Sequence, residues 1–316
     1  MNTKRIYTQK GEVLDFTFSQ NRYDFIVDEI PLGEFSNRGN FLVLKIKKIF
    51  ISTWDLLSII SEKLDIDEHQ IGYSGLKDKN ATTTQYISIP LNKSRDFKLL
   101  NSKYIEVLDT FRHHEKLKIG NLKGNKFKIT LKDINPDNLM TLYNRISKIQ
   151  KHGVPNYFGF QRFGKDEKFD KTRAIVYGEE IIKDKKLEKF MKFTYQSYFF
   201  NAWLAKRVEL SNEQSLNKLL VLKGDIFEDK SKKVITGLLP GRNVVRAKDE
   251  AGEIEKEFDD IFIHEKGLRR AAWVYPQNIK NKYIKEKNWM ELEFSLPKSS
   301  YATVVIEAIA NKNFGH

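Results

Sequence analysis

The chain contains 316 residues, which corresponds to about two domains of ordinary size. Hydrophobic residues make up 40% and aromatic residues 12% of the sequence, enough for a sizeable core, so extensive disorder is excluded. Lysine and arginine outnumber aspartate and glutamate by 55 to 42, and this net charge of +13 favours a polyanionic partner. The absence of cysteine excludes disulfide scaffolds, thiolate nucleophiles, iron–sulfur clusters and cysteine-ligated zinc.

The distribution of apolar and charged residues favours a soluble, cytoplasmic, RNA-binding protein. Residues 1–16 carry no apolar segment of signal-peptide length, and the longest apolar stretch, residues 301–310, is far shorter than a membrane span. Residues 93–132 contain eleven basic against four acidic side chains, and residues 145–192 contain thirteen against seven. Because phenylalanine and tyrosine are interleaved with both runs, we expect an RNA-binding surface, although a solvated face would give the same charge pattern.

The first half of the chain predicts one helix and three strands. Residues 23–29 are strand-like, and residues 52–64 open with capping candidates and place four apolar side chains on one helical face: Leu56, Leu57, Ile60 and Leu64. Residues 86–89, closed by Pro90, and the alternating residues 127–131 predict strands.

The second half predicts three helices and a strand. Asn135 can cap a helix that has Pro136 in its first position and ends at Gly153, and residues 196–210 predict another helix. Residues 290–296 alternate as a strand that Pro297 ends, after which Ser299 or Ser300 can cap a last helix. Strands and helices mix without a βαβ rhythm, which predicts an α+β fold with largely antiparallel sheets.

Standard catalytic signatures are missing from the sequence. There is no phosphate-binding GxxxxGK[ST] loop, no dinucleotide-binding GxGxxG and no HExxH. The six histidines, which include His316, show no metal-ligand spacing. An enzyme with this sequence is therefore expected to use carboxylates, hydroxyls and shape, without a cofactor or a metal.

Residues 72–85 form the candidate reactive loop, because they join a predicted helix to a predicted strand. Asp78 lies between Lys77 and Lys79, and cationic neighbours favour the ionised carboxylate that a nucleophile needs. The alternative is a polar loop in which Asp78 caps a turn.

Residues 154–164 form the second candidate, because aromatic residues and glycines alternate there around Asn156 and Arg162. This segment can stack a flipped base, with Asn156 bonding to the base edge, or it can be an aromatic core under a turn. Phe294 and the segment 23–29 leave the same choice open, since their alternation also suits a sheet core.

Together these segments resemble the TruD family of tRNA pseudouridine synthases. Residues 75–85 resemble its GLKD(R/K)xAxTxQ motif, and residues 156–164 its NYFGxQRFG motif. Shorter similarities follow the family's order along the chain: residues 24–29 (DFxVxE), 120–127 (GxLxGNxF), 238–241, 268–271 and 294–303 (FxLPxGSYAT).

The resemblance implies a pseudouridine-synthase catalytic domain with a mixed, mostly antiparallel sheet, formed by residues 1–179 and 269–316. An inserted α+β TRUD domain is expected at residues 180–268. The implied reaction converts a uridine of tRNA, at position 13, to pseudouridine. It requires tRNA as partner and no cofactor, metal, membrane or further protein.

The resemblance also implies roles for individual residues. Asp78 matches the nucleophile, and four residues match or adjoin positions at the target base: Phe25, Asn156, Phe158 and Phe294. The family usually carries a lysine where this sequence has Ser19, so another basic group must support the carboxylate. The candidates for this role, or for binding RNA phosphates, are Lys77, Lys79 and Arg162.

Two alternatives to this catalytic function stay open. Because the lysine is missing at Ser19, the chain could be a tRNA-binding or RNA-chaperone module with weak or no catalysis. A metal-dependent nuclease would need converging acids, and Asp78 has no acidic neighbour in its loop.

Overall fold

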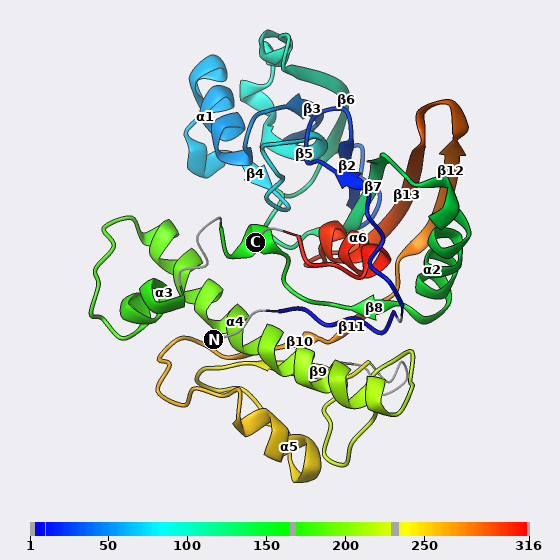
Figure 1. The fold of residues 1–316 in the computed structure, drawn as a ribbon. Coiled ribbons are helices and arrows are strands. Elements are labelled where there is room, and N and C mark those ends of the chain that lie inside the picture. Colours follow the sequence, from blue (N-terminus) through cyan, green and yellow to red (C-terminus); the bar gives the residue numbers. More distant parts are fainter. Residues whose placement is uncertain (1–3, 10, 165–168, 229–233, 315–316) are drawn as a thin grey trace. The chain divides into compact units, whose positions relative to one another are not determined.

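The computed structural model describes residues 4–9, 11–164, 169–228 and 234–314 (Figure 1). Its contacts divide these residues into two compact units. The sheet unit comprises residues 15–137 and 277–299, and the helical unit comprises the described residues of 1–14, 138–276 and 300–316. This division by contacts does not test the inserted domain expected at residues 180–268, which stays a prediction.

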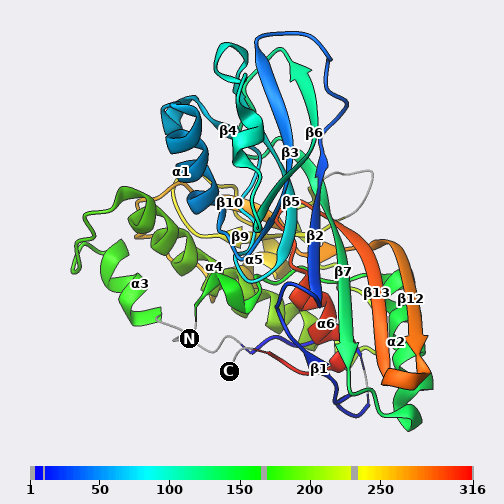
Figure 2. The ribbon, with the colours of Figure 1, turned by 90° about the horizontal axis from the view of Figure 1, so that it is seen from above.

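A nine-stranded mixed sheet forms the sheet unit. Its strands run in the order β12-β13-β7-β2-β5-β3-β6, with β1 beside β7 and β4 beside β5. Only β2 and β5 pair in parallel. Figure 2 shows β2, β7, β13 and β12 side by side. The strands are β1 (Thr17–Phe18), β2 (Phe25–Pro31), β3 (Phe41–Ile49), β4 (Gly72–Tyr73), β5 (Thr82–Pro90), β6 (Ile105–His113), β7 (Leu122–Lys132), β12 (Gln277–Ile284) and β13 (Trp289–Pro297).

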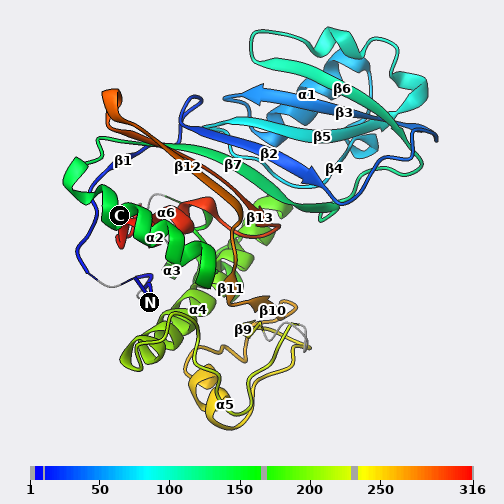
Figure 3. The same cartoon turned by 90° about the vertical axis from the view of Figure 1, so that its right-hand side faces the viewer.

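Helix α1 (Thr53–Leu64) packs on one face of this sheet (Figure 3). Ser52 caps it in a capping box, since its hydroxyl accepts from the Asp55 N–H while the Asp55 carboxylate accepts from the Ser52 N–H. The predicted apolar face is confirmed, because its four residues are buried against strand side chains such as Leu44 and Ile87. Burial of this face holds the residues that begin α1 close to the reactive loop described below.

The helical unit contains five helices, α2 (Leu139–His152), α3 (Phe169–Val176), α4 (Lys185–Glu213), α5 (Asp249–Lys256) and α6 (Ala302–Ala310), among its described residues. Two short antiparallel ribbons complete it: β9 (Thr236–Leu239) with β10 (Leu268–Ala271), and β8 (Val154–Pro155) with β11 (Trp273–Val274). A short 3₁₀ turn lies at Phe160–Arg162 in this unit, and another, at Pro136–Asn138, spans the point of the chain at which one unit ends and the other begins. Four more lie in the sheet unit, at Glu68–Gln70, Leu91–Lys93, Phe97–Leu100 and Lys285–Lys287.

The predicted elements are present, with differences at their ends. Helix α2 ends at Gly153 as expected, where φ is 73°, but it begins only after a 3₁₀ turn that contains Pro136. Helix α4 is longer than residues 196–210 because a charged first turn, capped by Asp184, extends it. The predicted serine cap of α6 is wrong, since Tyr301 holds the cap position and no side chain bonds there.

The amino-terminal segment packs within the helical unit against α6. Glu307 of α6 forms a buried ion pair with Arg5, with Nε and Oε2 2.6 Å apart, and also accepts from the Tyr7 hydroxyl. The Leu14 N–H donates to the carbonyl of Ala310. These bonds fix α6, and with it Tyr301 at its start. Among the described residues, no helix combines the length and the apolar character needed to cross a membrane.

Candidate active site

The loop that carries Asp78 connects β4 to β5 and is anchored at several points. The Lys77 N–H donates to Thr53 Oγ1 at the start of α1, with N and O 2.9 Å apart. The carbonyl of Ser74 accepts from the Gly120 N–H, and the carbonyl of Lys79 accepts from the Ala81 N–H. These backbone bonds hold the loop on both sides of Asp78.

Lys77 is engaged with Glu29 rather than with Asp78. Its Nζ lies 2.7 Å from Glu29 Oε2, and both side chains are buried. Burial raises the pKa of the Glu29 carboxyl, and the Lys77 charge opposes that rise. Because Glu29 lies on β2, this ion pair links the motif at residues 24–29 to the reactive loop. Each of the two motifs contributes one of its charges.

Asp78 is exposed, and within the described part of the chain its carboxylate forms no ion pair and no hydrogen bond with another residue, while its own backbone N–H donates to it. Desolvation by the surrounding protein raises the pKa of this carboxyl, while the charges of Lys48 and Lys77 lower it. The expected cationic neighbours therefore lower the pKa of Asp78, but desolvation, which the sequence did not indicate, raises it. A carboxylate that has no ion-pair partner, and whose pKa is raised by desolvation and lowered by nearby lysines, can act as a nucleophile or a base.

Lys48 of β3 is the cation that the sequence reasoning missed. It is 1% exposed, and its Nζ donates to the carbonyls of Asp78, 3.4 Å away, and Ile51. Desolvation lowers its pKa to about 8, with the Asp78 charge as the largest opposing influence. A signal was present in the sequence, because Lys48 continues the buried alternation of Leu44 and Ile46 along β3.

The other basic candidates have different surroundings. Lys79 is exposed, and its Nζ lies 3.7 Å from Asp55 Oδ2. Ser19, at the position of the missing lysine, is exposed just after β1. Lys48 is thus the best-placed buried cation beside Asp78 among the described residues of the sheet unit.

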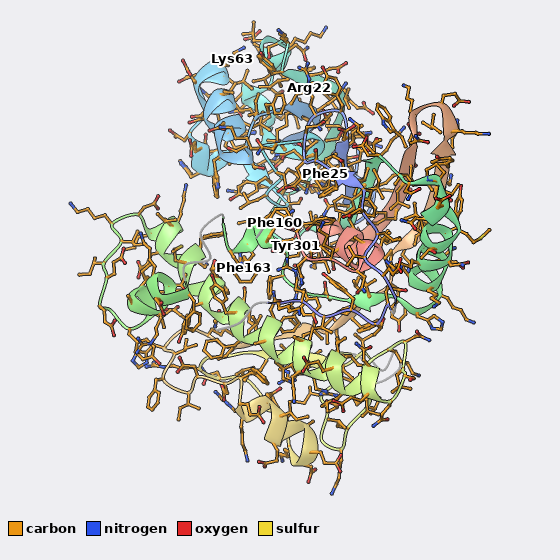
Figure 4. All side chains as sticks on the ribbon, in the orientation of Figure 1. Arg22, Phe25, Lys63, Phe160, Phe163 and Tyr301 are labelled. Atoms are coloured by element: carbon orange, nitrogen blue, oxygen red, sulfur yellow. The ribbon has the colours of Figure 1, made fainter. Side chains whose placement is uncertain are left out.

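Phe25 and Phe294 belong to one aromatic row in the sheet unit. Phe127 of β7 lies between them, with ring centroids 6.1 Å from Phe25 and 5.6 Å from Phe294. Phe25 and Phe294 are each 1% exposed. Figure 4 labels Phe25 on β2. Their roles at the target base stay predictions, because a packed row also suits the core alternative.

Substitution of Phe294 distinguishes a residue that stacks on the target base from a residue of the sheet core. As a stacking residue, Phe294→Leu should lower the single-turnover rate at least tenfold, or about 1.4 kcal/mol, because an aromatic face is lost. Its melting temperature should stay within a few degrees, since this repacking costs about 1–2 kcal/mol. Thermal melts and single-turnover assays measure both.

Leu292→Ala is the matched control, because Leu292 is also buried on β13 and shares the face of Phe294. It should lose stability first and activity only through unfolding. If both variants lose stability but keep normal rates in the folded fraction, Phe294 is a core residue.

Asn156 of the helical unit is buried in a dense set of hydrogen bonds. Its N–H donates to the carbonyl of Ala272 and its Nδ2 to that of Ala271, while Oδ1 accepts from Arg270 Nη2 at 3.0 Å. The amide retains one N–H and one lone pair for a ligand. Its binding to the target base therefore stays a prediction that this geometry permits.

Phe158 and Arg162 lie in the same unit as Asn156. Asn201 of α4 bonds both the N–H and the carbonyl of Phe158, so α4 fixes this segment. The Arg270 guanidinium carbon lies 4.0 Å from the Phe158 ring centroid, and that of Arg162 lies 5.5 Å away. Phe158 is 8% exposed. Phe163 and Tyr301, labelled in Figure 4, mark the segments that flank this cluster.

The structure therefore groups the predicted residues into two sets, one in each unit. The sheet unit holds Asp78, its neighbouring lysines, Phe25 and Phe294, and the helical unit holds Asn156, Phe158 and Arg162. Among the described residues, which do not include His316, no three His, Cys, Asp or Glu side chains form a group that could hold a metal.

Comparison with known proteins identifies the family. The family model described as tRNA pseudouridine synthase D (TruD) matches residues 3–193. The chain belongs to the TruD family. It is 35% identical to tRNA pseudouridine synthase D of Wolinella succinogenes, with 98% of each chain covered, and 37% identical to that of Nitratiruptor sp., also with 98% of each covered.

A solved structure supports the fold. The crystal structure of a Methanosarcina mazei protein described as tRNA pseudouridine synthase D (TruD) matches with a TM-score of 0.69 and 24% identity. The match covers 98% of this chain and 96% of that one. The expected α+β pseudouridine-synthase fold with a mostly antiparallel, partly parallel sheet is thus confirmed.

Proposed function

We propose that this protein isomerises a uridine of tRNA, the one at position 13, to pseudouridine in the cytoplasm. Family membership supports the reaction class. The observation that carries the proposal is the pattern of ion pairs in the reactive loop. Lys77 and Lys79 have carboxylate partners, while the Asp78 carboxylate between them has none among the described residues. The one acid of the family motif is therefore free to react.

The proposed reaction rearranges bonds without net gain or loss of atoms. The N1–C1′ glycosidic bond of the uridine breaks, the uracil rotates, and a C5–C1′ bond forms. C5 loses its proton and N1 gains one, so the product is an isomer of the substrate. In this proposal the Asp78 carboxylate is the nucleophile, which attacks the ribose or the uracil and leaves again.

The remaining predicted residues hold the base while it is detached. Phe25 and Phe294 supply apolar and stacking surface, and Asn156 supplies hydrogen bonds to the uracil edge. Phe158 adds a further aromatic ring, which packs against the guanidinium groups of Arg162 and Arg270. Stacking on an aromatic ring contributes about 1–3 kcal/mol per base, a useful fraction of the cost of unstacking a flipped nucleotide.

Lys48 takes the place of the family lysine that is missing at Ser19. Its buried ammonium lies at the Asp78 carbonyl, where its charge lowers the pKa of the Asp78 carboxyl. This removes the main argument for a module that has kept the fold without catalysis.

The decisive experiment incubates the purified protein with uridine-labelled tRNA and maps pseudouridine by a modification-specific chemical method. We expect one modified uridine, at position 13, and no product with tRNA in which this uridine is replaced by cytidine. Tight binding of tRNA without pseudouridine would favour the RNA-binding module and contradict the proposal. A pseudouridine at another position would support the proposed activity and contradict position 13 as its target.

Removal of divalent metal provides a second test. Because an isomerisation through a carboxylate needs no redox or Lewis-acid partner, the single-turnover rate should change less than about twofold in EDTA. The tRNA is folded beforehand, and monovalent salt maintains its structure. No nucleotide or reductant should be needed. A strict requirement for a divalent ion in the chemical step would favour the nuclease alternative.

A further inference from the structure

Two arginines of the helical unit lie together without a carboxylate partner among the described residues. Arg270 of β10 and Arg162 both pack over the Phe158 ring, and neither forms an ion pair with any residue that the structure describes. Three other buried or half-buried arginines in this unit do have one: Arg5 with Glu307, Arg207 with Asp225, and Arg269 with Glu255. The missing counter-charge therefore distinguishes these two arginines from those three.

The protein atoms fix the Arg270 guanidinium on one side only. Its Nε and Nη2 donate to the carbonyl of Asn156 at 3.1 and 2.9 Å, and Nη2 also reaches Asn156 Oδ1. Nη1 makes no hydrogen bond with the described residues and is not enclosed by them. Arg270 is 8% exposed, so one donor of an otherwise buried cation remains for an external acceptor.

Arg162 offers more free donors than Arg270. Its Nε donates to Ser197 Oγ, while Nη1 and Nη2 make no hydrogen bond in the described part of the chain and are not enclosed by it. Three aromatic rings hold the guanidinium carbon, with centroids 5.5 Å away for Phe158, 5.1 Å for Phe190 and 5.9 Å for Phe193. Aromatic packing fixes the position of the cation without neutralising its charge.

Electrostatics of the pair favour an incoming anion. Desolvation, together with the charge of Arg162 and against the opposing influence of Tyr301, lowers the pKa of Arg270 to about 10. Desolvation also lowers the pKa of Arg162, against Tyr301 again. Two close cations that mutually repel in a dry site are stabilised when an anion binds both.

Helix α6 adds to the same site. Tyr301, whose ring centroid lies 6.1 Å from that of Phe158, is its cap residue, and no side chain bonds to the first N–H groups of this nine-residue helix. The partial positive charge of an uncapped helix start favours an anion close to it. Gly159 keeps the segment tight, because a Cβ there would lie 2.8 Å from Thr303 Oγ1.

We propose that Arg162 and Arg270, stacked over Phe158 beside the start of α6, bind one phosphodiester group of the substrate RNA. The inference rests on the proposed function for the identity of the ligand, since a tRNA substrate supplies phosphodiesters. A guanidinium pair with free terminal nitrogens matches the oxygens of a phosphate. Phe158 then serves as a platform for cations at least as much as for a base.

The test measures tRNA affinity as a function of salt with the full-length protein in an Asp78→Asn background, so that no chemistry intervenes. Arg162→Gln and Arg270→Gln should each weaken binding about tenfold at ~0.1 M salt and reduce the slope of log affinity against log salt by about one. The double variant should lose little more than either single variant, because both act on one phosphate.

The matched control is Arg246→Gln, because the Arg246 guanidinium already pairs with Asp259 and should not respond to RNA. Affinity and salt slope should match the parent. If Arg270→Gln does not fold, Arg162→Gln alone decides, since the Arg162 side chain makes one hydrogen bond with the protein. Unchanged affinity and slope in a folded Arg162→Gln variant would overturn the proposal.

A second measurement identifies the source of the anion. The Nε–H NMR signals of Arg162 and Arg270 are followed during titration with inorganic phosphate, uridine monophosphate, uridine and tRNA. We expect shifts with the monophosphate and with tRNA but not with uridine. Shifts with inorganic phosphate alone would assign the site to a free anion and overturn the RNA assignment. If wild type forms no pseudouridine while the expected shifts and slopes appear, the proposed function fails and the phosphate site stands.

Discussion

The Asp78→Asn variant should lose pseudouridine formation by at least about 10³-fold, equivalent to ~4 kcal/mol of transition-state stabilisation, while its affinity for tRNA stays within a few-fold of wild type. Asparagine has nearly the volume of aspartate but lacks the negative charge that a carboxylate nucleophile needs. Binding is expected to persist because phosphate contacts at basic side chains dominate affinity.

The fold should tolerate this exchange. In the described part of the chain the Asp78 carboxylate bonds only to its own backbone N–H, which an asparagine Oδ1 can still accept, so no bond to the rest of the fold is lost. Its pKa is raised in the folded protein, which means that the ionised form destabilises the fold at neutral pH relative to the unfolded chain. Asparagine removes that cost, so the melting temperature should not fall.

Single-turnover assays with labelled tRNA measure the effect on the rate. The matched control is Asp67→Asn, since Asp67 is an exposed residue of the sheet unit outside the reactive loop. Its rate should equal that of wild type. An Asp78→Asn variant that turns over at a rate close to wild type would show that Asp78 is not the nucleophile.

The second largest effect is expected from Lys48→Met, with a loss of about 10²-fold in single-turnover rate at pH 7. Methionine approximates the length of the lysine side chain but removes the charge that opposes the rise in the pKa of Asp78. Loss of one preorganised electrostatic partner typically costs a rate factor of 10²–10³. Burial of the charged lysine is itself unfavourable, and its removal offsets the loss of the hydrogen bonds to the carbonyls of Ile51 and Asp78, so stability should change little.

The pH profile distinguishes an electrostatic role from a structural one. Below about pH 8 Lys48 carries its charge, and above it the charge is lost, so the wild-type rate should fall as the pH rises through about 8. In Lys48→Met this fall should disappear, and the rise at low pH should move upward because the pKa of Asp78 increases. A profile identical in shape to wild type, with only a lower rate, would contradict this role.

Lys47→Met controls for the loss of a lysine on the same strand. Lys47 points to the opposite face of β3, is 40% exposed at its side chain and pairs with Glu106. Its rate and pH profile should match wild type, because a pair at the surface contributes little.

The elements that the sequence predicted well are those with local causes. Helix α1 has its capping box, its apolar face and its carboxyl-terminal end within one stretch of chain, and the structure reproduces each. The alternation along β7 and β13 likewise fixes which residues are buried. The predicted cap residue of α6 was wrong because serine is a frequent cap but not an obligatory one. In the structure Tyr301 occupies the cap position.

For the candidate site, the sequence by itself determined the family motifs, Asp78 as the acid of the reactive loop and the basic character of its surroundings. Only the tertiary structure decided which lysine or arginine lies beside which carboxylate, carbonyl or amide group. It pairs Lys77 with Glu29, places Lys48 beside Asp78 across 30 residues, and brings Arg270 to Asn156 across 114. The physical reason is that helical and strand periodicity is local, whereas electrostatic pairing depends on distances between strands and loops that are set when the sheet and the helical segments pack.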